Sequence, residues 1–231
     1  MPLRRTSCEE SLLPTSEWKI EKNLEVVFMD KIGLIQTLRK EGFSDRIISA
    51  FEKVKREDFV SENLKKLAYE NIALPITESE TISQPSTIAI SLSLLHLKEN
   101  QKVLELGSGC GYVLALISEI VGEGGKVLGV EIVKKLADKS RENLGSYKNI
   151  GIFNKNGRDG LKEAAPFDRI LISAALEEIP KEILKQLKEE GMIVAPIGSA
   201  FIQTLTSIKR ENGDFVVKKQ VPGFVFVRFV D

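Results

Sequence analysis

Apolar residues recur at helical spacing through the first third of the chain. After Met29, for example, Ile32, Ile35 and Leu38 recur every three positions, which indicates one buried helix face. The helices predicted in this part of the chain cover residues 32–38, 44–53, 62–69 and 87–97. Ser44 and Ser86 precede two of these segments and are their expected N-caps, because a serine hydroxyl can accept from a free amide at a helix start.

From residue 102 the pattern changes to short apolar runs that alternate with helical segments. The runs predict strands at residues 102–106, 126–131, 149–154, 167–173 and 191–197. Helices are predicted at residues 112–121 and 133–144 and after Pro180. Nearly continuous apolar strands that alternate with helices are typical of a parallel sheet covered on both faces. The predicted fold class is therefore α/β, with a Rossmann-like, doubly wound and mainly parallel sheet.

The C-terminal part departs from this alternation. Two strand-like runs flank Asn212–Gly213 and predict an antiparallel hairpin, and FVFVRFV (224–230) predicts a last strand. We therefore divide the chain into an N-terminal extension (1–28), a helical subdomain (29–79) and an α/β domain (80–231). Residues 1–28 are polar and weakly patterned, and one hypothesis is that Met29 is the natural start.

Composition narrows the class of protein. The 231 residues are 42% hydrophobic, enough for one sizeable core, and 33 basic residues balance 33 acidic ones. We therefore expect no nucleic-acid or membrane partner. Cys8 and Cys110 lie in a polar tail and a glycine loop, which indicates a reducing compartment. No apolar run approaches the roughly 20 residues that cross a bilayer, and no signal peptide is evident. The expected protein is a cytoplasmic monomer.

The first strand of the predicted sheet runs into a glycine loop. In VLELGSGCGY (103–112), Gly107, Gly109 and Gly111 stand between strand and helix, and Glu105 precedes them. Amides at a helix start favour a polar ligand, and missing side chains let that ligand approach. The dinucleotide fingerprint G-x-G-x-x-G would need a glycine where Tyr112 stands. The observed E-x-G-x-G-x-G is instead typical of S-adenosylmethionine-dependent methyltransferases.

Glu131 strengthens this interpretation. It ends the next predicted strand, where a carboxylate can accept hydrogen bonds from both hydroxyls of a ribose. The predicted cofactor site therefore comprises Glu105, Gly107, Ser108, Gly109, Gly111 and Glu131. The alternative is a nucleotide-like fold that has lost its ligand or binds a different one.

Several segments, in order along the chain, resemble the protein-L-isoaspartate (D-aspartate) O-methyltransferase family. The matching segments are VKREDFV (54–60), LAYENIALPI (67–76), TISQP (81–85), VLELGSGCGY (103–112), FDRILISAALEEIP (167–180), LKEEGMIVAPIG (187–198) and VRFV (227–230). The hallmark of the family is a T-I-S-x-P segment just before the cofactor domain. The resemblance covers about residues 30–230 and is more specific than any single motif.

The resemblance implies methylation of the α-carboxylate of L-isoaspartyl and D-aspartyl residues in damaged proteins, with S-adenosylmethionine as cofactor and no metal. The methyl ester then closes to a succinimide, which starts repair. A carboxylate is already ionised near neutral pH, so the protein must align and desolvate it and needs no general base. The resemblance implies a substrate segment at residues 80–87, in which Ser83 is the catalytic serine that holds the acceptor and Thr81 and Ile82 lie beside the isoaspartyl backbone.

The chain departs from the family pattern at two places. Many relatives have D-G where this chain has Asn156–Gly157, and that aspartate reads the adenine amino group. The Asn156 carbonyl is an uncharged acceptor for the same group, and Asp159 is an alternative partner if the loop is shifted. Residues 84–86 read Q-P-S where many relatives have A-P-H, which we interpret as variation within the family.

Three alternative functions stay open at this point. The first is a carboxyl methyltransferase for a small acid or for one protein, recruited by residues 1–28. The second is a catalytically silent relative that binds the cofactor. The third is a nucleic-acid methyltransferase, although the P-P-Y/F motif of amine methylases is absent after the fourth strand. We interpret His96 and Cys110 as structural, and residues 185–190 as a solvated helix face.

Overall fold

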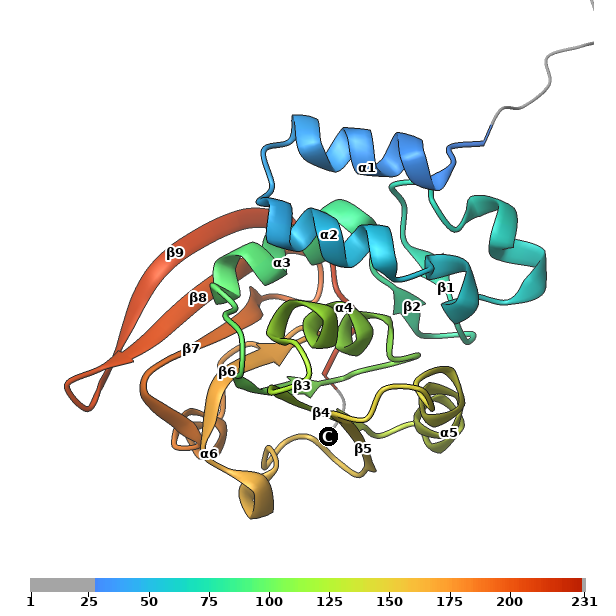
Figure 1. Ribbon diagram of the computed structural model, residues 1–231. Helices are drawn as coiled ribbons and strands as arrows, with labels where there is room; N and C mark the ends of the chain where they lie inside the picture. Colours follow the sequence, from blue (N-terminus) through green and yellow to red (C-terminus); the bar gives the residue numbers. More distant parts are fainter. Residues whose placement is uncertain (1–27, 230–231) are drawn as a thin grey trace, which may run out of the picture.

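The computed structural model describes residues 28–229, so the predictions for residues 1–27 lie outside it. A sheet of seven strands forms its centre, in the order β5-β4-β3-β6-β7-β8-β9 (Figure 1). The strands are β3 (Lys102–Leu106), β4 (Lys126–Glu131), β5 (Ile150–Asn154), β6 (Phe167–Ile172), β7 (Leu187–Gly198), β8 (Gln203–Glu211) and β9 (Asp214–Phe224). Strands β3 to β7 are parallel, and β8 and β9 are antiparallel to their neighbours. The predicted fold class is confirmed.

Alternating side chains of the parallel strands reach two separate hydrophobic clusters. On β3, Val103 belongs to a cluster with the helices of the N-terminal part, whereas Leu104 and Leu106 belong to the cluster on the opposite face. Because neighbouring residues of a strand point to opposite faces, a nearly continuous apolar run buries both. Glu105 therefore shares the face of Val103, where it lies buried.

Helices cover both faces of the sheet (Figure 1). They are α1 (Lys31–Lys40), α2 (Asp45–Lys53), α3 (Pro85–Leu95), α4 (Tyr112–Val121), α5 (Lys134–Asn143) and α6 (Lys181–Leu184), with 3₁₀ turns η1 (Arg56–Phe59), η2 (Glu62–Leu67) and η3 (Lys162–Ala164). Helices α3 and α4 lie on the sheet, and α2 packs against both of them. Apolar residues of α1 and α2 join the same cluster as those of α3 and α4. The segment predicted as a helical subdomain thus shares its core with the α/β part.

The hairpin prediction is confirmed. Strands β8 and β9 pair along their length, from Glu211 opposite Asp214 beside the turn to Gln203 opposite Phe224 at the other end. The register has two irregularities. The turn residues Asn212 and Gly213 have φ values of 56° and 87°. Positive φ at both central positions is the geometry of the tight hairpin turn that Asn-Gly favours.

The start of α3 corrects one prediction. The helix begins at Pro85, with Gln84 in the N-cap position, so Ser86 lies inside the first turn and is not the cap. Proline suits the first helical position because it lacks the amide that would be unpaired there. The Ser86 hydroxyl instead donates to Glu41 Oε2 (2.7 Å) and accepts from Asn71 Nδ2 (2.8 Å). Ser44 does occupy the N-cap position of α2, without a side-chain hydrogen bond.

Two further segments differ from their predictions. Residues 185–190 are not a helix face, because α6 ends at Leu184 and β7 begins at Leu187. The described part of the predicted last strand, residues 225–229, is not a strand, because β9 ends at Phe224 and only an isolated bridge joins Arg228 to Ala175. The predicted substrate segment, residues 80–87, contains a short strand, β2 (Thr81–Ile82), which pairs with β1 (Leu74–Pro75).

Candidate active site

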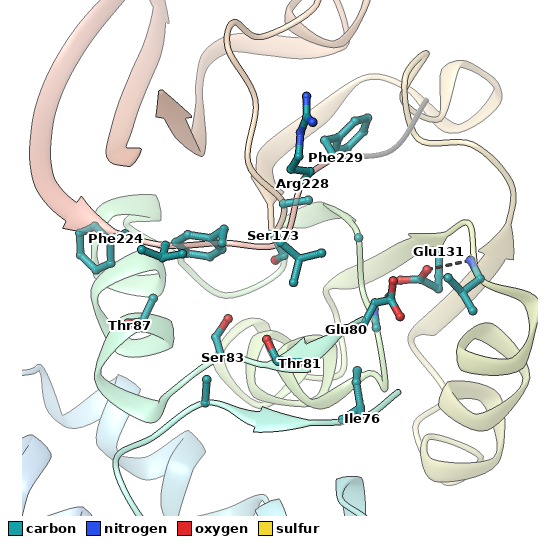
Figure 2. Close-up of a pocket in the computed structure, with 18 of the residues that line it drawn as sticks. Ile76, Glu80, Thr81, Ser83, Thr87, Glu131, Ser173, Phe224, Arg228 and Phe229 are labelled. Atoms are coloured by element: carbon teal, nitrogen blue, oxygen red, sulfur yellow. Dashed lines mark hydrogen bonds between the residues drawn. The ribbon is translucent and has the colours of Figure 1, made fainter. Parts of the chain in front are cut away.

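A cavity of about 400 Å³ opens where β3, β4 and β6 end (Figure 2). The carboxyl edge of a parallel sheet is the usual place for a ligand in this architecture, and the volume suits a small molecule. One wall comes from the loops after these three strands, and the other from residues 80–84 and 223–229. The cavity therefore joins the predicted cofactor loop to the predicted substrate segment.

The three glycines of the loop have different surroundings. Gly107 and Gly109 line the cavity and have φ values of 80° and 51°, which side chains disfavour. Gly111 does not line the cavity. A Cβ atom at Gly111 would lie 2.4 Å from Ser140 Oγ and 2.6 Å from Leu144 Cδ1. The structure thus places Gly111 against α5, where its small size is needed for packing, and its role in wrapping the cofactor stays a prediction.

Glu131 lies at the edge of the cavity, where the prediction places it. Its Oε2 accepts from the amide of Gly109 and its Oε1 from the amide of Val133, both at 2.8 Å. These bonds fix the carboxylate at the end of β4 although its side chain is buried. Each carboxylate oxygen keeps a further lone pair, so Glu131 can also accept from the hydroxyls of a ribose.

Glu105 lies beneath the glycine loop in a small recess that continues the cavity. It is 1% exposed; its Oε1 accepts from Ser173 Oγ (2.7 Å), and its buried Oε2 has no partner among the described residues. The pKa of Glu105 is raised to about 8, mainly by burial; the Ser173 hydrogen bond acts to lower it, and the charge of Glu131 acts to raise it. An unpaired buried oxygen of this kind fits a cationic ligand. The Ser108 hydroxyl lines the same recess, also without a partner.

The substrate segment forms the opposite side of the cavity. The side chains of Thr81 and Ser83 point into it, facing the chain that carries Phe224 (Figure 2). Ile82, between them, is 4% exposed and packs in the hydrophobic cluster. This alternation follows from the strand geometry of β2, which presents every second side chain to one side. The Ser83 carbonyl accepts from Arg56 Nη2 at 3.0 Å.

The comparisons with known proteins agree with this geometry. A family model described as Protein-L-isoaspartate(D-aspartate) O-methyltransferase (PCMT) matches residues 29–231. The chain belongs to this family. A curated member from Methanothrix thermoacetophila is 39% identical over 204 residues, 87% of this chain and 95% of the relative. Another, from Methanosarcina mazei, is 34% identical over 237 residues, 100% of this chain and 97% of the relative.

Solved structures give the same result. A structure described as a protein-L-isoaspartate O-methyltransferase superposes with a TM-score of 0.79 at 30% identity, and covers 86% of this chain and 65% of its own. A Plasmodium falciparum structure superposes with a TM-score of 0.76 at 26% identity, covering 87% of this chain and 99% of its own. It is described as a candidate protein-L-isoaspartate O-methyltransferase in complex with S-adenosyl-L-homocysteine. The predicted resemblance is confirmed.

Some residues that line the cavity were not predicted as site residues from the sequence. Residues 223–229 form a wall of the cavity, although their apolar alternation predicted a strand. The signal that could have found them is Pro222–Gly223, where the register between β8 and β9 shifts just before β9 ends at Phe224. Ser173 follows β6 at the carboxyl edge and donates to Glu105, and Glu80 also lines the cavity (Figure 2).

The adenine contacts stay a prediction. Gly157 lines the cavity, but neither Asn156 nor Asp159 does. The Asn156 side-chain oxygen accepts from the amide of Arg158 (2.8 Å), and Asp159 pairs with Lys162 Nζ (3.2 Å). In this structure both side chains thus have partners within their own loop.

Cys110 and His96 remain interpreted as structural residues. Burial raises the pKa of the Cys110 thiol to about 11, so it is a poor nucleophile near neutral pH. His96 ends α3 in the left-handed conformation, with φ of 48°. Residues 28–229 contain no group of three or more potential metal ligands. Over the same range, no helix is long and apolar enough to span a bilayer.

Proposed function

We propose that this protein transfers a methyl group from S-adenosylmethionine to the α-carboxylate of L-isoaspartyl and D-aspartyl residues in damaged proteins. The observation that carries this proposal is one shared cavity. Ser83, from the hallmark segment of the family, lines it together with Gly107, Gly109 and Glu131 of the methyltransferase loop. A cofactor and a peptide carboxylate can therefore meet there.

The residues present fit S-adenosylmethionine. Glu131 accepts from the ribose hydroxyls, while Gly107 and Gly109 let the backbone approach the ligand closely. The unpaired Glu105 Oε2 accepts from the ammonium group of the methionine part, which removes the cost of its burial. When bound, the cofactor supplies an electrophilic methyl group on a sulfonium ion.

The opposite wall of the cavity holds the acceptor. The Ser83 hydroxyl donates to the substrate carboxylate and orients one oxygen toward the methyl group. The extended β2 segment lies beside the isoaspartyl backbone at Thr81, in the way that a strand binds a peptide. Phe224 and Phe226 line the same space and exclude water, which makes the carboxylate a stronger nucleophile. No proton has to be moved, since the acceptor enters as an anion and leaves as a neutral ester.

A peptide pair tests this function. The protein is incubated with methyl-labelled cofactor and either an isoaspartyl peptide or its aspartyl twin. We expect label in the isoaspartyl peptide alone, as a base-labile ester. Equal labelling of both peptides, or of neither, would contradict the proposal. Calorimetry with S-adenosylhomocysteine separates an inactive protein that binds the cofactor from one that does not bind it.

A further inference from the structure

Arg56 is a fully buried guanidinium next to the substrate segment. It is 0% exposed; its Nη1 donates to the carbonyls of Ala68 (2.7 Å) and Glu70 (3.4 Å). Its Nη2 donates to the carbonyls of Ile72 (3.1 Å) and Ser83 (3.0 Å). No carboxylate within residues 28–229 forms a salt bridge with it. A buried charge without a counter-ion is costly, so this arrangement is not explained by stability alone.

The guanidinium joins two segments that differ in sequence and in role. Residues 68–72 lead into β1, and Ser83 directly follows the short strand β2. A planar guanidinium holds its donors in a fixed fork, so it can set both segments in one relative position. Fixing the carbonyl of Ser83 fixes the peptide plane after it. The direction of the Ser83 side chain, half-buried at the cavity wall, depends on that backbone.

The same guanidinium also lies next to the cofactor side of the cavity. Its Cζ atom is 6.0 Å from the ring centroid of Tyr112, which is the first residue of α4 after the glycine loop. The ring of Phe59 packs edge-on against Tyr112 with centroids 5.3 Å apart. Arg56 thus contacts both the substrate segment and the start of α4, the helix that directly follows the glycine loop.

We propose that Arg56 is a positioning residue, which holds the Ser83 hydroxyl in register with the methyl donor. This inference rests on the proposed function, because it concerns the acceptor half of the same site. Arg56 itself does not line the cavity and does not touch the substrate. Its replacement should impair use of the peptide and leave cofactor binding intact.

A second link keeps the two segments together when Arg56 is replaced. Asn71 Nδ2 donates to Ser86 Oγ (2.8 Å), and the amide of Ser86 donates to Asn71 Oδ1 (2.9 Å). This pair joins residues 68–72 to the first turn of α3, three residues after Ser83. A conservative change at Arg56 should therefore alter the angle of the Ser83 peptide without releasing the whole segment.

Arg169 is a matched control elsewhere in the fold. It is 8% exposed and donates to the carbonyls of Leu95 (2.7 Å), Asp168 (2.7 Å) and His96 (3.4 Å). Burial lowers the pKa of both arginines. Arg169 holds the C-terminal end of α3, whereas Ser83 precedes its N-terminal end. The general cost of replacing a buried arginine is thus common to both, and the proposed positioning is specific to Arg56.

The experiment compares wild type, Arg56→Lys and Arg169→Lys. Calorimetry with S-adenosylhomocysteine counts the competent cofactor sites, and peptide kinetics are then expressed per site. For Arg56→Lys we expect kcat/KM for the isoaspartyl peptide to fall about 10- to 100-fold, with cofactor affinity unchanged within about twofold. Arg169→Lys should lower the melting temperature and keep kcat/KM per site. Arg56→Gln, which introduces no buried charge, is measured in parallel in case the lysine variant does not fold.

The outcomes are distinguishable. Unchanged kcat/KM per site in an Arg56 variant that binds cofactor would overturn the positioning role. An equal loss in Arg169→Lys would do the same. If neither Arg56 variant binds cofactor, the residue is needed for the fold as a whole, which also contradicts the proposal. A wild-type protein that labels neither peptide would instead overturn the proposed function itself.

Discussion

At the scale of single residues, the two acidic groups of the cofactor site are held in different ways. The Glu131 carboxylate accepts hydrogen bonds from two backbone amides, which stabilise its charge. Glu105 has only the Ser173 hydroxyl on one oxygen and nothing described on the other. Since burial without a counter-charge raises a carboxyl pKa, Glu105 is largely protonated at neutral pH until a cation binds.

The raised pKa of Glu105 predicts a pH-dependent stability of the ligand-free protein. The pKa is about 8 in the folded state against an ordinary value of 4.5, so folding favours the protonated form. Stability from this group is therefore full below about pH 4.5 and is lost as the pH rises toward 8. Glu105→Gln removes this dependence. The free energy of unfolding of Glu105→Gln minus that of wild type should therefore increase by about 2 to 5 kcal/mol between pH 4.5 and pH 8.

Urea denaturation at several pH values measures this difference. A gap between Glu105→Gln and wild type that does not change with pH would contradict the pKa argument. The same variant should bind S-adenosylhomocysteine at least about tenfold more weakly, since an amide provides no charge for the ammonium group.

Ser83→Ala is the direct test of the acceptor site. The Ser83 hydroxyl has no hydrogen bond within the described chain, so its loss should cost little stability. We expect kcat/KM for the isoaspartyl peptide to fall about 10- to 100-fold, which is the value of one hydrogen bond to a charged group. Ser86→Ala is the matched control, because that hydroxyl bonds Glu41 and Asn71 outside the cavity. A lower melting temperature with normal kinetics is expected for the control, and the reverse for Ser83→Ala.

At the scale of elements, the packing between the glycine loop and α5 depends on one residue. A side chain at Gly111 would collide with Ser140 and Leu144, and the backbone there has φ of 89°. Gly111→Ala should therefore lower the free energy of unfolding by about 2 kcal/mol or more, measured by urea denaturation. Gly145→Ala is the control, since its Cβ would meet no atom closer than 3.6 Å. Equal effects of the two changes would contradict this explanation.

The elements also show what sequence patterns can predict. The parallel strands, α4, α5 and the Asn212–Gly213 turn were predictable, because buried apolar runs and tight turns leave little choice of conformation. Residues 185–190 were not, since a run of charges fits an exposed helix or an exposed strand equally well. The strand is supported by cross-strand ion pairs that the sequence does not reveal, Lys209 with Glu190 and Arg210 with Glu189.

The site was predictable to a similar extent. Ser83, Gly107, Gly109 and Glu131 line the cavity because their motifs follow strand ends, where the topology brings loops together. Ser173 and residues 223–229 are also there, but their contribution depends on tertiary contacts between distant segments. The packing of Gly111 against α5 was not predictable, because a glycine needed for packing looks like one needed for a ligand.

At the scale of the whole molecule, residues 1–28 are expected to be dispensable for the basic reaction. The family model begins at residue 29, and the Met29 nitrogen donates to Glu70 Oε1 at 2.6 Å, a bond that a new terminus can keep. A chain starting at Met29 should keep its melting temperature within about 3 °C and its peptide kcat/KM within about twofold.

This truncation also tests the hypothesis of a specific partner. Loss of activity on a protein substrate, with peptide activity retained, would support recruitment by residues 1–28. Loss of peptide activity as well would contradict the prediction that the extension is dispensable.

The wall formed by residues 223–229 has a consequence for how the protein is made. The glycine loop, Glu131 and Ser83 all leave the ribosome well before this segment does. A nascent chain that ends at residue 222 has the strands that hold the cofactor, but the acceptor half of its cavity is open to water. A chain cut short by a premature stop codon in this stretch would lack this wall of the cavity, so we expect it not to methylate the peptide.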